Sequence, residues 1–188
     1  MDEKNIIKKL KGLLGPSRFK HSLRVRDKVL HLSKFHKVSV KKAGIAGLLH
    51  DVSRHMDRGG LLKFAEKIKV KIDPISRAEP KLLHASLSAY IARTEFGIRD
   101  RQILRAISSH TLGRKHMTML EKMIYVADHI EEGRSHAGVA STRKLAETDI
   151  DQAIVAISSS MIKYLSDNDL PIHPMTIEVK DHYLKKHE

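Results

Sequence analysis

The sequence predicts an all-α protein with a single domain. Apolar residues recur at helical spacing along almost the whole chain, and we find no convincing period-two run of the kind that marks a strand. The pairs Gly15-Pro16, Gly59-Gly60 and Asp73-Pro74 punctuate this pattern. A chain of 188 residues has the size of one domain and can bury a core without a disulfide. We therefore expect one helical domain over residues 1–188.

Three helices are expected before residue 50. An amphipathic stripe over residues 6–14 ends at Gly15-Pro16. Ser17 is expected to cap a second helix that runs to about Phe35. Ser39 is expected to cap a third helix that runs through Leu49.

The remaining helices are expected after two breaks, at Gly59-Gly60 and at Asp73-Pro74. Their predicted ranges are Lys81 to Glu95, Asp100 to His110, Met117 to Glu132, Ser141 to Asp167, and Pro174 to His187. Gly97 and Gly113 close the first two of these, and Pro174 suits a first helical turn.

The composition excludes several classes of protein. The chain has no cysteine, which rules out disulfide frameworks, thiolate metal sites and a cysteine nucleophile. It has no apolar run of about 18 residues, so no membrane-spanning helix is expected. The first residues, MDEKNIIKKLKGLL, are charged and have only short apolar patches. These features predict a cytoplasmic protein without a membrane partner.

Charge is distributed unevenly along the chain, which has a net charge of +13. Residues 1–42 hold 13 basic and 3 acidic side chains, a balance of +10, whereas residues 145–188 hold 4 basic and 8 acidic ones, a balance of −4. A basic half of this kind favours an anionic partner. The alternative is that the lysines only solvate helix surfaces.

Four histidines and two aspartates lie in apolar surroundings where burial would be costly. They are His21, His50, Asp51, His84, His110 and Asp128. A single buried histidine usually bonds a backbone carbonyl. With 13 His and 12 Asp in the chain, roughly 0.8 adjacent His-Asp pairs arise by chance, so the pair His50-Asp51 alone proves nothing. Six such residues together favour a shared metal cluster. The other histidines that stand among charged or small residues, His31, His36, His136, His182 and His187, receive no role.

The types of ligand indicate the chemistry of this cluster. Imidazoles and carboxylates without thiolates suit Fe, Mn, Co or Zn better than a soft metal or calcium. Six ligands are too many for one ion with open positions, whereas two ions bridged by one carboxylate use them economically. Adjacent helical residues point about 100° apart, so His50 and Asp51 can both reach the cluster only near a helix end. A pair of metal ions favours displacement at phosphorus.

The order His21, His50-Asp51, His84, His110, Asp128 resembles the H...HD...H...H...D signature of the HD-domain phosphohydrolases, an all-helical superfamily. More narrowly, six segments resemble the YqeK family of bacterial HD proteins: RFKHSLRV (18–25), AGLLHDVSR (46–54), LLHASLSAYIA (82–92), AISSHTLG (106–113), MTMLEKMIYVADHIEEGR (117–134) and IHPMTIE (172–178). Together they span residues 18–178.

The resemblance implies symmetrical hydrolysis of diadenosine tetraphosphate, a dinucleoside polyphosphate, to two ADP. It implies two divalent transition-metal ions, with Fe²⁺ expected and Mn²⁺ or Co²⁺ as alternatives. His21, His50, Asp51 and Asp128 would hold one ion and His84 and His110 the other, with Asp51 as the bridge and a bridging water as nucleophile. Asp51, Arg18 and Arg54 are the expected catalytic residues.

The expected substrate contacts are basic or polar residues near these motifs. Arg18 lies three residues before His21 on the same helix face, and arginine matches phosphate oxygens with two donors. The full set is Arg18, Arg54, Lys81, Thr111, Arg134 and His173. Two roles stay open: Arg134 as a phosphate ligand or a helix-end charge, and Glu131 as an acid that orients a metal ligand or a solvated surface residue.

Two other functions stay open. Another HD enzyme, acting on nucleoside monophosphates or guanosine tetraphosphate, would share the metal ions and differ in its pocket. A non-enzymatic nucleic-acid-binding module could use the basic half, but aromatic residues make up only 4% of the chain and give few stacking platforms. The sequence is compatible with a homodimer and does not establish one.

Overall fold

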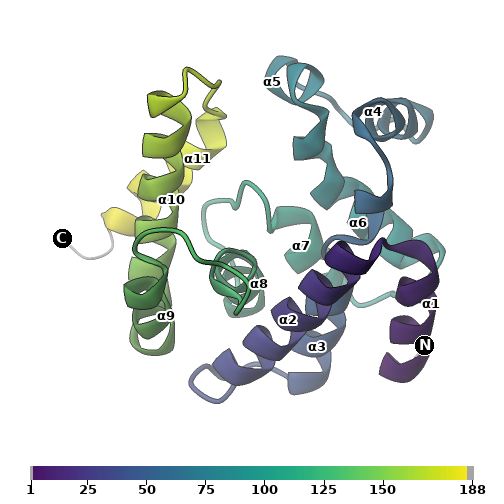
Figure 1. Cartoon of the computed structure of the whole chain (residues 1–188), viewed down its shortest axis with the longest axis horizontal. Coiled ribbons are helices and arrows are strands. Elements are labelled where there is room, and N and C mark those ends of the chain that lie inside the picture. Colours follow the sequence, from purple (N-terminus) through teal and green to yellow (C-terminus); the bar gives the residue numbers. More distant parts are fainter. Residues whose placement is uncertain (1, 186–188) are drawn as a thin grey trace.

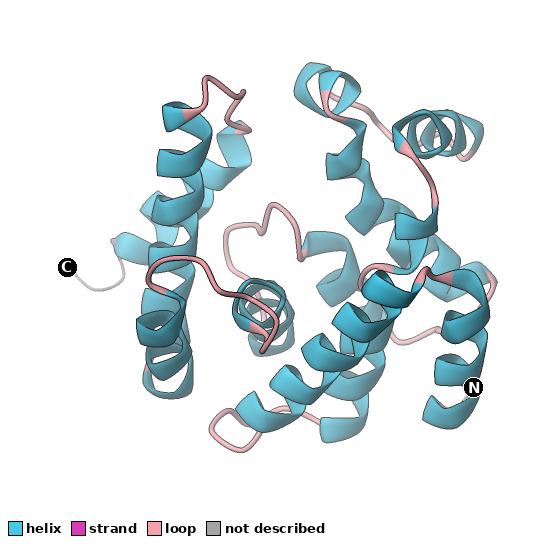
Figure 2. Ribbon diagram, viewed as in Figure 1, coloured by secondary structure: helices cyan, strands magenta, loops and turns pink. Residues whose placement is uncertain are grey.

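The computed structural model describes residues 2–185, which form eleven α-helices and two 3-10 helices and contain no strand (Figures 1 and 2). The all-α prediction is confirmed. In chain order, the elements are α1 (Glu3–Leu13), α2 (Pro16–Leu32), α3 (Val40–Leu49), η1 (Val52–His55), α4 (Arg58–Lys67), α5 (Pro74–Ala78), η2 (Pro80–Leu83), α6 (His84–Thr94), α7 (Arg101–Ser109), α8 (Met119–Ile130), α9 (Val139–Thr148), α10 (Ile150–Asp167) and α11 (Pro174–Leu184).

The second helix begins and ends differently from the prediction. Gly15 is the N-cap of α2 and Pro16 its first helical residue, so Ser17 is not the cap. Proline fits this position because the first helical N–H has no partner within the helix. The helix ends at Leu32, and turns replace the predicted last residues up to Phe35.

The third helix packs closely on the second. Ser39 caps α3 as predicted, accepting a hydrogen bond from the backbone N–H of Lys42. A Cβ atom at Gly47 would lie 2.9 Å from Cα of Arg26 and 3.1 Å from Cγ2 of Val29. The missing side chain of Gly47 therefore allows α3 to lie directly against the backbone of α2.

The middle of the chain folds into short helices. The predicted break at Gly59-Gly60 is wrong, because both glycines lie in the first turn of α4. The side chain of Asp57 accepts a hydrogen bond there from Gly60 N–H at 2.7 Å. Asp73-Pro74 does mark a boundary, with Asp73 as the N-cap of α5. Helix α6 begins at His84 instead of Lys81 because residues 80–83 form the tighter turn η2.

The last predicted helices also need one correction. Ser141 to Asp167 is not one helix, because Asp149 ends α9 and caps α10. Its side chain accepts hydrogen bonds from the backbone N–H groups of Asp151 and Gln152, both at 3.1 Å. Helix α11 ends at Leu184, and the predicted end at His187 lies outside the described residues.

Helix α8 is the centre of the fold. Nine of its twelve residues are buried, and it packs against α2, α3 and α7 as well as α9 and α10. Figure 1 shows it end-on, with α2 and α3 on one side and α9 and α10 on the other. Residues near the C-terminal end of α8 therefore lie deep between the two halves of the molecule. Among the described residues, no helix has both the length and the apolar character needed to cross a membrane.

Candidate metal centre

The structure brings the six predicted metal ligands together in one cluster. His21 lies on α2 and Asp128 near the end of α8, whereas His84 is the first residue of α6. His50 and His110 are the C-cap residues of α3 and α7, and Asp51 follows His50 directly. All six are buried apart from Asp128, which is partly buried. Their ligand atoms form overlapping groups that could hold metal ions.

Asp51 is placed between two pairs of imidazoles. Its Oδ2 atom lies 3.6 Å from His21 Nε2 and 3.5 Å from His50 Nε2. Its Oδ1 atom lies 3.1 Å from His84 Nε2 and 3.8 Å from His110 Nε2. Each carboxylate oxygen therefore faces a different histidine pair, which is the arrangement that a bridging carboxylate requires.

Asp128 completes the first of these pairs. Its Oδ1 atom lies 3.1 Å from His21 Nε2 and 4.0 Å from His50 Nε2. The first group thus has two imidazoles and two carboxylates, whereas the second has two imidazoles and one oxygen of Asp51.

Backbone carbonyls hold three of the imidazoles in one tautomer. Each of these rings places Nδ1 against the carbonyl oxygen of the residue three positions earlier. The distances are 2.7 Å from His50 to Gly47, 2.5 Å from His84 to Lys81 and 2.7 Å from His110 to Ile107. A carbonyl oxygen only accepts hydrogen bonds, so Nδ1 carries the proton and the neutral ring presents a lone pair at Nε2.

The free lone pairs converge. Nε2 of His21 lies 3.2 Å from Nε2 of His50, and Nε2 of His84 lies 2.9 Å from Nε2 of His110. Two unprotonated nitrogens give no hydrogen bond, whereas a cation between them would bind both. The donor set therefore fits divalent metal ions of the class that imidazole and carboxylate prefer.

Glu131 orients the fourth imidazole. Its Oε1 atom accepts a hydrogen bond from His21 Nδ1 at 3.1 Å, and Oε2 accepts one from Arg24 Nε at 2.5 Å. Burial alone would raise the pKa of Glu131, but Arg24, the Gly133 N–H and His21 lower it to about 2. Only 1% of Glu131 is exposed, so it is not the solvated surface residue that the sequence left open. Sequence reasoning missed Arg24, whose only signal was its position three residues after His21.

The local electrostatics keep the cluster in a metal-binding state. Burial would raise the pKa of both aspartates. His50 and the other imidazoles around Asp51 nevertheless hold its pKa well below the ordinary value, and His21 does the same for Asp128. Burial lowers the pKa of His50 to about 4. At His110 burial would lower the pKa, but the Asp51 carboxylate, together with Asp128 and the Ile107 carbonyl, outweighs burial and raises it. A metal ion would compete with a proton for His110, so we expect metal binding to depend on pH.

Five of the six predicted substrate contacts line one cleft of about 230 Å³ beside the cluster: Arg18, Arg54, Lys81, Thr111 and Arg134. Arg18 Nη1 donates to Asp51 Oδ2 at 2.6 Å, and Thr111 Oγ1 lies 3.1 Å from His84 Nε2. Arg134 donates from Nε and Nη2 to the backbone oxygen and Oδ1 of Asp128, both at 2.8 Å.

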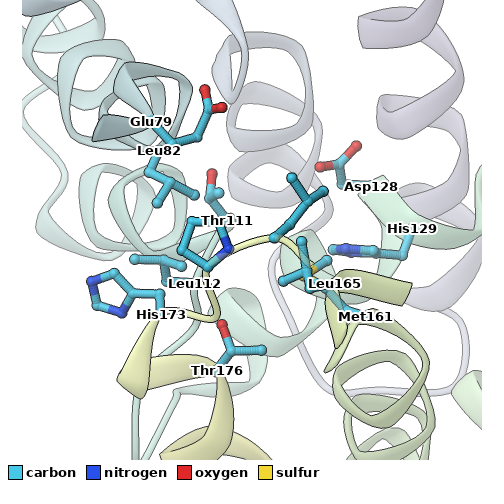
Figure 3. Close-up of a pocket in the computed structure, with 12 residues that line it drawn as sticks. Glu79, Leu82, Thr111, Leu112, Asp128, His129, Met161, Leu165, His173 and Thr176 are labelled. Carbon is cyan, nitrogen blue, oxygen red and sulfur yellow. The ribbon is translucent and has the colours of Figure 1, made fainter. Parts of the chain in front are cut away.

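His173 lies elsewhere, in a second cavity that we call the apolar pocket. This cavity has a volume of about 310 Å³ and shares Leu82, Thr111 and Asp128 with the cleft. His173 caps α11, and its Nε2 atom lies 3.6 Å from Oδ2 of Asp73. The remaining walls are mostly apolar: Figure 3 shows Leu112, Met161 and Leu165. Leu170 and Pro171 also line the cavity. Sequence reasoning missed this pocket, because its residues follow the same helical spacing as the core.

Comparison with known proteins agrees with this geometry. The HD domain family model matches residues 18–133. The chain is 34% identical to the symmetrical bis(5'-nucleosyl)-tetraphosphatase of Bacillus subtilis, over 94% of each chain. It is 33% identical to the protein of the same description from Staphylococcus aureus, over 92% of this chain and 90% of that one. A crystal structure from Clostridium acetobutylicum, described as a predicted HD superfamily hydrolase involved in NAD metabolism, matches with a TM-score of 0.95 and 32% identity, over 99% of this chain and 98% of that one.

Proposed function

Because this chain belongs to the HD domain family, we propose that it is a metal-dependent phosphohydrolase that cleaves diadenosine tetraphosphate symmetrically into two ADP. Relatives described as symmetrical tetraphosphatases match nearly its whole length. The observation that carries the proposal is the Asp51 carboxylate, whose two oxygens face separate histidine pairs. The absence of cysteine and the nucleotide substrate favour a cytoplasmic location.

The residues would hold two ions, as the resemblance implied. His21, His50 and Asp128 would bind the first, His84 and His110 the second, and Asp51 both. Bound divalent ions at such a site supply a hydroxide near neutral pH and neutralise charge on phosphate oxygens. We propose Fe²⁺ as the resident metal, with Mn²⁺ or Co²⁺ as alternatives, because the donor set contains nitrogen and oxygen but no sulfur.

The basic residues of the cleft would bind the four phosphates. Arg18, Arg54 and Lys81 line it together with Arg134, and their charges oppose those of the polyphosphate. Both Arg18 and Arg134 also hold a metal-ligating carboxylate, so each would position a ligand as well as bind substrate. The Thr111 hydroxyl lies where the cleft meets the apolar pocket.

The apolar pocket would take one nucleoside. Its volume of about 310 Å³ and its mostly apolar walls suit a nucleobase, and it opens directly beside the cleft. His129 donates its Nδ1–H to the Tyr125 carbonyl oxygen at 2.9 Å and points the other edge of its ring into the pocket (Figure 3). The Thr176 hydroxyl faces the same space. His129 and Thr176 would thus give polar contacts to the base.

A second candidate is another HD hydrolase, acting on a nucleoside monophosphate or guanosine tetraphosphate with the same metal ions. Four cationic side chains in the cleft, beside a nucleoside pocket, favour a polyphosphate substrate over a monophosphate.

Product analysis distinguishes these functions. Protein reconstituted anaerobically with Fe²⁺ is incubated separately with diadenosine tetraphosphate, nucleoside monophosphates and guanosine tetraphosphate, and products are separated by chromatography. We expect ADP as the single product of the dinucleotide. Equal amounts of AMP and ATP would show asymmetric cleavage and contradict the proposal, and turnover of guanosine tetraphosphate alone would establish the second candidate.

A further inference from the structure

A second hollow lies beyond one wall of the apolar pocket. It runs between the loop that joins α8 to α9 and the outer side of α10, and we call it the α10 groove; His136, Gly138, Ser160 and Tyr164 are among its lining residues. The groove and the apolar pocket share His129 and Met161, and their volumes are about 360 and about 310 Å³. The molecule therefore has two cavities of similar size on either side of one wall.

The lining of the groove is suited to a flat aromatic group. Of the four tyrosines of the chain, Tyr125 and Tyr183 are buried and Tyr90 packs edge-on against Phe64, whereas 61% of Tyr164 is exposed. A Cβ atom at Gly138 would meet only Ser141 Oγ, at 4.0 Å. An exposed aromatic ring beside small residues offers a face on which a nucleobase can stack.

The loop between α8 and α9 runs from the cleft beside the metal centre to the groove. Arg134, which lines the cleft and holds Asp128, is followed two residues later by His136 in the groove. Nε2 of His136 lies 3.0 Å from the carbonyl oxygen of His129, to which it donates, and this fixes the loop against the end of α8. A chain of phosphates that leaves the cleft past Arg134 would be directed toward the groove.

The chemistry of symmetrical cleavage requires two equivalent halves. The bond that breaks lies at the centre of the polyphosphate, so one nucleoside with two phosphates extends from the metal centre on each side. The apolar pocket accommodates one half. We propose that the α10 groove binds the second nucleoside of the substrate, with its base stacked on Tyr164. This inference rests on the proposed function, because only a dinucleoside substrate has a second base to place.

One pair of variants tests the groove directly. Ser160 and Ser159 are adjacent, exposed residues of α10, and of the two only Ser160 lines the groove. Ser160→Trp should fill the groove and raise KM for diadenosine tetraphosphate about ten- to hundredfold, the loss expected for one stacked base. KM for adenosine tetraphosphate, which has the same four phosphates but one nucleoside, should stay unchanged. Ser159→Trp should leave both KM values as in the wild type.

Substitutions of Tyr164 give an independent test. Tyr164→Ala should raise KM for the dinucleotide in the same direction, and Tyr164→Phe should restore it because the ring remains. The chain contains no tryptophan, so Tyr164→Trp introduces a single indole fluorophore at the groove. We expect a dinucleotide with a methylene group at its central bridge, which resists cleavage, to quench this fluorescence while leaving that of Ser159→Trp unchanged.

The outcomes separate this inference from the proposed function. If the wild type yields only ADP while Ser160→Trp and Tyr164→Ala leave KM for the dinucleotide unchanged, the second nucleoside lies elsewhere and the inference is wrong. An equal rise of KM for both substrates would also overturn it, because the groove would then not distinguish the second nucleoside. Failure of the wild type to produce ADP would remove the proposed function and this inference with it.

Discussion

Arg18 donates a hydrogen bond from Nη1 to Oδ2 of Asp51 at 2.6 Å. The same carboxylate oxygen faces His21 and His50, so the guanidinium lies at the edge of the metal cluster instead of in the outer part of the cleft. The sequence predicted Arg18 as a phosphate contact, and the structure adds a second partner. If Arg18 binds a phosphate of the substrate, as we propose, substrate binding and the position of Asp51 are coupled through one side chain.

Arg18→Ala should lower kcat/KM for the dinucleotide by roughly ten- to a thousandfold, because it removes the positive charge that we propose to contact the reacting phosphate. The metal content should stay the same, since six ligands remain. Steady-state kinetics and elemental analysis measure the two effects. Lys20→Ala, an exposed lysine two residues away, is the control for general electrostatics and should change the rate little. Loss of metal in Arg18→Ala would mean that its main role is to hold Asp51.

Asp51→Asn should reduce the bound metal to about one ion per chain or fewer and abolish turnover, since an amide offers one oxygen and cannot serve both histidine pairs. Elemental analysis of protein loaded under identical conditions gives the stoichiometry. Asp27→Asn, at a side chain that is 65% exposed, serves as the matched control. An Asp51→Asn protein that keeps the full metal content would disprove the bridging assignment.

Glu131→Gln should weaken metal binding or activity by about ten- to a hundredfold, because the amide is a poorer partner for His21 Nδ1 and for Arg24. Competition with a chelator measures the affinity. The neighbouring Glu132 is 67% exposed and bonds Lys28, so Glu132→Gln should have almost no effect. Equal behaviour of the two variants would assign Glu131 a purely structural role.

Gly47→Ala should destabilise the protein by about 1–3 kcal/mol, because the added methyl group meets the backbone of Arg26 at 2.9 Å. The Gly47 carbonyl also bonds His50, so metal affinity should fall together with stability. Gly12→Ala in α1, with open space around the new atom, should instead stabilise by about 0.4–1 kcal/mol. Chemical denaturation of both variants, with and without metal, checks the contrast.

The metal ligands could be predicted from the sequence, because a histidine or aspartate is conspicuous at an apolar helical position. His21, His84 and Asp128 stand out by that criterion alone. The apolar pocket could not be predicted. Met161 and Leu165 follow the same helical spacing as core residues, and only the folded structure shows that they face a cavity instead of other side chains. The predicted helix boundaries were wrong where a single side chain decides whether a helix continues or ends. Asp149, for example, caps α10 within a continuous helical pattern of apolar residues.

A pH-dependent contribution to stability is expected from Glu121. This buried residue accepts bidentate hydrogen bonds from Arg114 at 2.6 and 2.7 Å and closes the capping box of α8 with Thr118. Burial would raise its pKa, but Arg114 and Thr118 lower it below the ordinary value of 4.5. The stabilisation that the Glu121 carboxylate gives to the folded state is therefore fully present above pH 4.5. It is lost as the pH falls through the lower pKa of Glu121 in the folded state.

Glu121→Gln should accordingly lower the free energy of unfolding at neutral pH by about 1–3 kcal/mol, with the deficit shrinking in acid. Urea unfolding of wild type and variant across the acidic range gives this difference. A deficit that is constant with pH would show that packing, and not the charge of Glu121, is responsible.

Three of the proposed ligands lie where helices end, and at this position the backbone also contributes to the attraction of a cation. His50 and His110 are the C-caps of α3 and α7, and Asp128 is two residues from the end of α8. The aligned peptide dipoles of a helix leave about half a negative elementary charge at its C-terminus, where the last carbonyl groups lack helical partners. Three such ends meet at one point, so the main chain itself attracts positive charge there. Side-chain substitutions at the cluster would thus remove the ligands but leave the field that draws a cation to it.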